Sequence, residues 1–183
     1  AFPFASGSAD SALLATLSPG DYTVQVSGAS NSTGLCLVEV YDTDTIANTG
    51  PQAVNISTRG LSGSGAAKMI AGFILEGAAT RRVLIRAVGP GLAPFGVSGT
   101  LAEPTIELYN GRGLLHATAG EWGLQPNADE IRGAFASAGA FPLADGSKDA
   151  AMVIALPPGN WTVQVGAPGT ATGVALIEVY ALP

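Results

Sequence analysis

The chain contains one segment twice. Residues 1–41 align without a gap with residues 140–180, and 21 of the 41 positions are identical. Self-similarity of this length indicates repeated structural units. Residues 52–126 occur only once. If one unit is an N-half followed by a C-half, the chain holds a C-half and then a complete unit.

This order predicts two domains, of which one is incomplete. We expect residues 1–43 to be an orphan C-half of three strands and residues 44–51, which contain Thr, Asn, Gly and Pro, to be a linker. Residues 52–183 then form a complete unit with an N-half at 52–126 and a C-half at 139–183. Because a half-sandwich leaves apolar side chains and strand edges uncovered, the orphan needs a partner surface.

Turn signals divide each half into short strands. A strand is expected at Tyr22–Ser27, where the apolar residues Tyr22, Val24 and Val26 alternate with polar ones. One face of this strand is therefore expected to be buried and the other exposed to solvent. The first C-half is predicted to have strands at Ala12–Leu17, Tyr22–Ser27 and Gly34–Tyr41, the second C-half has the same pattern, and the N-half has strands at Val54–Thr58, Lys68–Leu75, Arg82–Val88, Thr105–Tyr109 and Leu114–Thr118.

One segment, at about 127–138, has the pattern of a helix. Asn127 is a candidate N-cap, Asp129 and Glu130 occupy the first turn, and Ile131 and Phe135 are four residues apart. About eleven short strands and one short helix predict an all-β fold, a β-sandwich or jelly-roll-like architecture.

Composition excludes several classes of protein. Only 12% of residues are charged and the net charge is −6, so no broad positive field is present to bind nucleic acid. No apolar run reaches the roughly 18 residues that cross a bilayer. Cys36, the single cysteine, cannot form an internal disulfide, and it aligns with Ala175, which predicts a small buried position. The chain starts with Ala1 rather than Met, and we expect a processed, secreted protein.

The C-half motifs resemble a known family. The runs LSPGDYTVQVSG and TGLCLVEVY resemble the bacterial pre-peptidase C-terminal domain, and PTIELYNGRGLLHAT is similar to a hairpin of the same superfamily. The stretch from NISTRG to YNGRG is similar to a repeat of large secreted and cell-surface bacterial proteins. The resemblance implies a β-sandwich with an accessory or structural role, located outside the cell or on its surface.

The residues offer little for catalysis. In the glycine-rich loop Gly60–Lys68, Ala66 and Ala67 separate the last glycine from the lysine and a strand follows, so a turn is expected rather than a phosphate-binding loop. His116 is the only histidine and no G-x-S-x-G motif is present. We expect no enzyme activity, and we expect His116 to be exposed or hydrogen-bonded on a strand.

Acidic residues give one weak metal hypothesis. Asp10 and Asp149 occupy the same place in both copies, and Asp145 lies in a loop nearby in sequence. Loop carboxylates of this kind could bind calcium, although an Asp in a turn more often bonds local backbone. Apart from this possible calcium, no metal or cofactor is expected.

Glu39 and Glu178 also match between the copies, within otherwise apolar strands. A carboxylate in such a strand faces solvent or pairs with a cation, and Arg59, Arg82 and Arg86 are the candidates. We therefore expect structural pairing rather than a catalytic dyad.

Two functional hypotheses follow. The first is a non-catalytic extracellular structural subunit that self-associates with other copies, into a filament or surface array, by strand or half-domain complementation. The alternative is a carbohydrate- or surface-binding accessory module of a larger secreted bacterial protein, with an exposed aromatic such as Trp122 holding polysaccharide. The residues expected at the self-association interface are Phe2, Leu13, Tyr22, Val24, Val26, Leu35, Leu37 and Tyr41.

Overall fold

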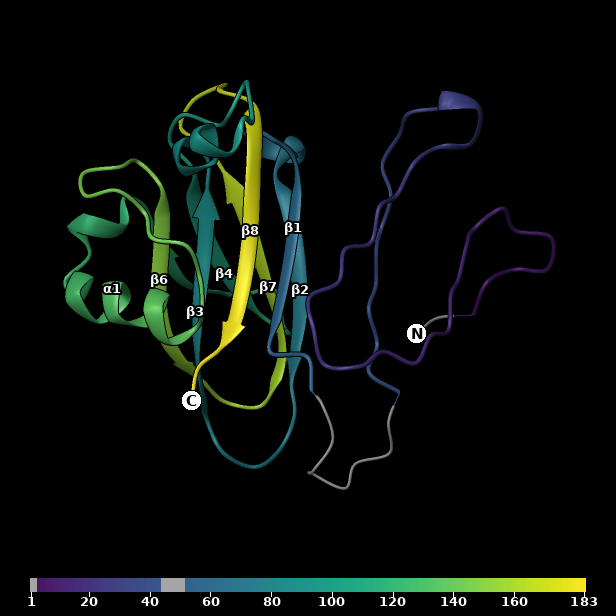
Figure 1. The fold of residues 1–183 in the computed structure, drawn as a ribbon, viewed down its shortest axis with the longest axis horizontal. Coiled ribbons are helices and arrows are strands. Elements are labelled where there is room, and N and C mark those ends of the chain that lie inside the picture. The colour runs from purple at the N-terminus through teal and green to yellow at the C-terminus, as the bar shows by residue number, and fades with distance from the viewer. Residues whose placement is uncertain (1–2, 44–51) are drawn as a thin grey trace. The chain divides into compact units, whose positions relative to one another are not determined.

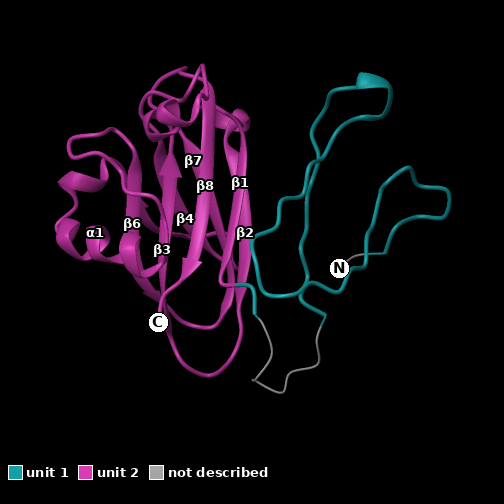
Figure 2. Cartoon of the chain, viewed as in Figure 1, with its two compact units in different colours: residues 1–53 teal, residues 54–183 magenta. Residues whose placement is uncertain are grey.

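The computed structural model describes residues 3–43 and 52–183 (Figure 1). The chain divides into two compact units, residues 1–53 and residues 54–183 (Figure 2). Phe2, one of the expected interface residues, and the expected linker 44–51 lie outside the described residues.

Residues 54–183 form a β-sandwich of two four-stranded antiparallel sheets, which confirms the expected fold class (Figure 1). The first sheet has the strand order β1-β8-β3-β6, and the second has the order β2-β7-β4-β5. The strands are β1 (Asn55–Ser62), β2 (Met69–Leu75), β3 (Arg81–Val88), β4 (Thr105–Asn110), β5 (Leu115–Ala119), β6 (Ala150–Leu156), β7 (Gly159–Gly166) and β8 (Gly173–Ala181).

The described residues also form short helices. The helix α1 (Ala128–Ser137) is the one expected from the sequence, and Ile131 and Phe135 on it are buried. Single 3-10 turns form η1, η2 and η4, and η3 is a longer one; their bounds are η1 (Ala29–Asn31), η2 (Gly65–Ala67), η3 (Pro90–Phe95) and η4 (Trp122–Leu124). The glycine-rich loop runs through η2 directly into strand β2, so it has the turn structure that was expected of it.

The side chains of β3 alternate between two hydrophobic layers. Val83 and Ile85 belong to the core between the sheets. Leu84 and Val88 face the other way, into a second buried cluster that includes Phe135 of α1. Because both faces of β3 are covered, any polar side chain on this strand needs a partner inside the protein.

Residues 3–43 contain no strand, so the three strands expected at Ala12–Leu17, Tyr22–Ser27 and Gly34–Tyr41 are a wrong prediction. Within the described ranges the strands number eight rather than about eleven, and the difference is these three. The reason is the absence of pairing partners, since the equivalent strands β6, β7 and β8 pair only with N-half strands.

Candidate functional site: the surface that joins the two halves

The two halves of the complete unit are interleaved. β8 lies between β1 and β3, β7 lies between β2 and β4, and β6 pairs with β3. No C-half strand is hydrogen-bonded to another C-half strand. We call the contacts of β6, β7 and β8 with the N-half the half-to-half surface. A C-half without an N-half therefore has no β-ladder available to it.

A buried ion pair lies at the centre of this surface. Arg86 on β3 and Glu178 on β8 are register partners, with 2.9 Å between Arg86 Nε and Glu178 Oε2 and side chains 0% and 6% exposed. The guanidinium carbon lies 4.3 Å from the ring centre of Phe141, and Arg86 Nη1 donates to the Phe141 carbonyl at 2.6 Å. The expected pairing of Glu178 with an arginine is confirmed, and the partner is Arg86.

The ion pair with Arg86 and a hydrogen bond from Tyr180 both hold the Glu178 side chain in place. The Tyr180 hydroxyl donates to Glu178 Oε1 at 2.7 Å. Burial raises the pKa of Tyr180, and the hydrogen bond to Glu178 raises it further. Burial lowers the pKa of Arg86, an effect that the charge of Glu178 opposes. Arg86 Nη2 has no hydrogen-bond partner within the described residues, so the Glu178 carboxylate is the charge that makes burial of this guanidinium tolerable.

Asp149 joins the halves at a second point. Its Oδ1 accepts a hydrogen bond from the Gly89 amide at 2.7 Å, and its Oδ2 accepts one from the Gly91 amide at 3.0 Å. The Ser147 hydroxyl also donates to Oδ2. Asp149 is completely buried. Sequence reasoning missed this role, although the match of Asp149 with Asp10 and the Gly-Pro-Gly run at 89–91 were both visible.

The calcium candidates have protein partners. Asp145 forms an ion pair with Arg132 at 2.8 Å, Asp149 binds the amides described above, and Asp10 accepts a hydrogen bond from Ser8. Among residues 3–43 and 52–183, no three histidine, cysteine or acidic side chains gather in a way that could hold a metal ion. Within residues 54–183, Asp145 and Asp149 thus take part in separate contacts.

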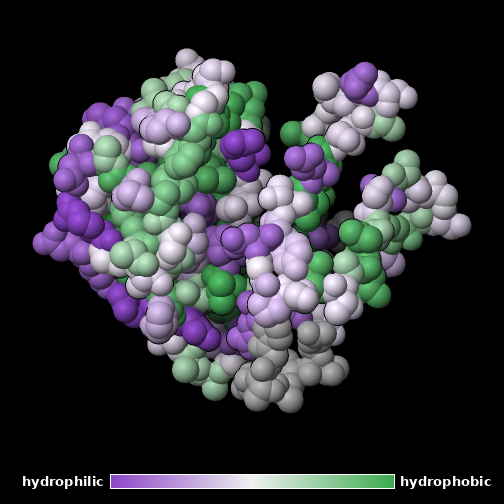
Figure 3. Space-filling model, in the orientation of Figure 1, coloured by the Kyte–Doolittle hydropathy of each residue, from purple (hydrophilic) through white to green (hydrophobic). Residues whose placement is uncertain are grey.

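The expected interface residues are exposed in the first copy, and most of their counterparts are buried in the second. Val24 is 68% exposed and Leu13 is 90% exposed, whereas the matching Val163 and Met152 are 0% and 7% exposed. Hydrophobic side chains accordingly lie on the surface of the first unit (Figure 3). The other described interface residues, Tyr22, Val26, Leu35, Leu37 and Tyr41, are exposed as well.

Cys36 does not lie in the small buried position that was expected for it. The aligned Ala175 occupies a fully buried position, but Cys36 itself is exposed. The small buried slot predicted for Cys36 therefore exists only in the second copy. The reason is the same as for the strands, because Ala175 belongs to the core cluster between the two sheets, to which both halves contribute.

Trp122 does not offer the exposed aromatic surface that was expected of it. Trp122, expected to be an exposed sugar-binding residue, is 1% exposed. Its indole packs against Phe135 and donates to the Ala144 carbonyl at 3.3 Å, so it belongs to the second buried cluster. His116 is exposed on β5, as expected, and contacts the Trp161 ring edge-to-face at 5.0 Å.

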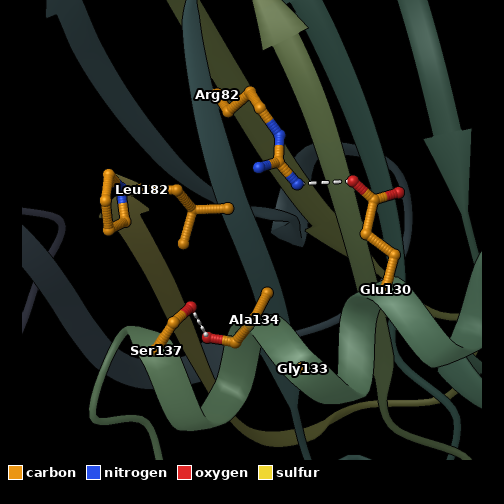
Figure 4. Close-up of a pocket in the computed structure, with 7 residues that line it drawn as sticks. Arg82, Glu130, Gly133, Ala134, Ser137 and Leu182 are labelled. Carbon is orange, nitrogen blue, oxygen red and sulfur yellow. Dashed lines mark hydrogen bonds and ion pairs between the residues drawn. The ribbon is translucent and has the colours of Figure 1, made fainter.

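A shallow pocket of about 310 Å³ lies between α1 and the end of the chain (Figure 4). The polar side chains on its wall bind one another or the backbone. Arg82 forms an ion pair with Glu130, and the Ser137 hydroxyl donates to the Ala134 carbonyl at 3.2 Å. This lining resembles an ordinary surface depression more than a site with free catalytic groups.

No family model matches the chain. No curated protein matches it either. The chain is similar to a solved structure, the pre-peptidase C-terminal domain of a collagenase from Bacillus anthracis, with 13% identity and a TM-score of 0.41. The similarity covers 69% of this chain and 89% of that chain.

In the described part of the chain, no helix has the length and apolar character needed to cross a membrane. The fold and the half-to-half surface together define a β-sandwich module made of two interleaved halves.

Proposed function

We propose that the chain is a non-catalytic structural part of an extracellular β-sandwich array, in which residues 1–43 complete a second sandwich. They would supply the equivalents of β6, β7 and β8 to another N-half of the type seen at 52–126. One observation carries the proposal: every β-ladder of the C-half at 139–183 is made with N-half strands. The sequence resemblance of the C-half to an accessory domain of secreted bacterial proteins supports the extracellular, non-catalytic assignment.

The number of halves narrows the self-association hypothesis. The 183 residues hold two C-halves and one N-half, and 139–183 already occupy that N-half. Exchange of halves between copies of these residues alone would always leave one C-half per copy without a partner. Assembly by complementation therefore needs one further N-half for each copy. Sandwiches joined in this way through segments such as 44–51 would form a linear array.

The polysaccharide-binding alternative has less support. Its expected aromatic residue, Trp122, is buried. Its indole is enclosed by Phe135 and by the Ala144 carbonyl, so it offers no ring face on which a sugar could stack.

The test of this proposal supplies residues 1–43 with an N-half of their own. Residues 52–139 are fused directly ahead of Ala1, because Ala1 aligns with Ala140. We expect the extended chain to be a folded monomer with two sandwiches, and its strand signal in circular dichroism to be about twice that of the 183-residue chain. The control fuses residues 52–139 to residue 44, which provides a second N-half but no second C-half. If the extended chain gains no more strand signal than this control, the proposal is wrong.

A further inference from the structure

The first copy keeps a set of polar residues that act at the half-to-half surface in the second. Four residues are identical at matching positions: Ser8, Asp10, Glu39 and Tyr41 correspond to Ser147, Asp149, Glu178 and Tyr180.

The local contacts of these residues are the same in both copies. The Asp10 amide donates to Ser8 Oγ at 3.1 Å, and the Asp149 amide donates to Ser147 Oγ at 3.1 Å. The Tyr41 hydroxyl donates to Glu39 at 2.9 Å, as the Tyr180 hydroxyl donates to Glu178 at 2.7 Å. The first copy thus already has the short-range part of each arrangement.

The long-range contacts differ. Glu178 faces the buried Arg86, and Asp149 binds the Gly89 and Gly91 amides. Glu39, in contrast, is exposed and accepts a hydrogen bond from Tyr41, two residues along the chain. A carboxylate can be buried only where a cation or several N–H groups receive it. An N-half that accepts the first copy must therefore offer a cation to Glu39 and backbone N–H groups to Asp10.

The shape of the N-half turn is part of the requirement. A Cβ atom at Gly89 would lie 2.0 Å from the Leu101 carbonyl oxygen, and one at Gly91 would lie 3.0 Å from Asp149 Oδ2. Glycine at position 91 lets its amide approach the carboxylate, and glycine at position 89 lets the turn pack against Leu101. An acceptor for Asp10 would need the same close approach.

Resting on the proposed function, we infer that Asp10 and Glu39 are recognition residues for the N-half partner. They would select an N-half that has an arginine at the position of Arg86 and a Gly-Pro-Gly turn at the position of residues 89–91. Specificity would come from rejection, because an N-half without these groups would leave one or two carboxylates buried and unpaired.

The test uses the extended chain, in which residues 52–139 precede Ala1. Glu39→Gln and Asp10→Asn should each lower the unfolding temperature of the added sandwich, by roughly 5–10 °C. The matched control is Asp21→Asn, which makes the same chemical change at a position where the second copy already has Asn160. In the 183-residue chain, neither recognition variant should change the unfolding temperature of residues 54–183.

A double-mutant cycle keeps the test decisive if Glu39→Gln prevents folding. Glu39→Leu combined with Arg86→Met in the added N-half should restore a folded added sandwich, because both buried charges are then removed. If Asp10→Asn and Glu39→Gln behave like Asp21→Asn, the recognition role is overturned while the proposed function stands. If the unmodified extended chain forms no second sandwich, the proposed function itself has failed.

Discussion

Arg86 and Glu178 face each other across the boundary between the two halves, with Arg86 Nε 2.9 Å from Glu178 Oε2. Arg86 belongs to an N-half strand and Glu178 to a C-half strand, and the two are register partners. The pair is therefore formed only when the halves are joined, which makes it a sensitive reporter of the half-to-half surface.

Arg86→Met should destabilise residues 54–183 by about 3–5 kcal/mol, because it leaves the Glu178 carboxylate buried without its cation. Chemical denaturation measures the loss. The control on the same strand is Arg82→Met, which breaks an ion pair whose side chains are 51% and 44% exposed, and should cost less than about 1 kcal/mol. Equal losses in the two variants would show that the buried pair has no special role.

Gly173 and Gly34 occupy matching positions in the two copies, in different surroundings. A Cβ at Gly173 would lie 2.5 Å from the Leu101 amide nitrogen, whereas a Cβ at Gly34 would meet nothing within 4 Å. Gly173→Ala should therefore lower stability by about 1–3 kcal/mol, as overpacking does. Gly34→Ala should leave the unfolding curve of the 183-residue chain unchanged. A comparable loss in both variants would contradict the absence of packing around the first copy.

Glu107 should make the sandwich sensitive to acid. A hydrogen bond from Lys68, and to a smaller extent one from Tyr109, holds the pKa of Glu107 below its ordinary value of 4.5. The pKa of Glu107 is therefore lower in the folded protein than in the unfolded chain. Its ionised form stabilises the folded state above pH 4.5, and this stabilisation is lost as the pH falls through the folded-state pKa.

The Lys68→Met variant tests this pH dependence. Urea unfolding should show that the variant is less stable than the parent at pH 7 and that the difference narrows at pH 3. Lys148→Met removes the same charge from the ion pair with Glu121, in which the lysine side chain is 51% and the glutamate side chain 19% exposed, and serves as the control. A Lys68→Met difference that is the same at both pH values would rule out the proposed role of Glu107.

Local patterns predicted the elements of the complete unit well. The alternation in β7 and the spacing of Ile131 and Phe135 in α1 are local features, and both elements form where they were expected. The same alternation at Tyr22–Ser27 gave a wrong prediction, because a strand also needs neighbours and no local pattern specifies them. The contact of Asp149 with Gly89, 60 residues away, was missed for the same reason.

Hydrogen exchange at two matching segments tests the central claim most directly. In the 183-residue chain, the amides of Trp161–Val165 should be protected, since β7 is a central strand, and those of Tyr22–Val26 should exchange without protection. In the extended chain, which supplies residues 52–139 ahead of Ala1, both segments should be protected. Protection of Tyr22–Val26 in the 183-residue monomer, or its absence in the extended chain, would contradict the account.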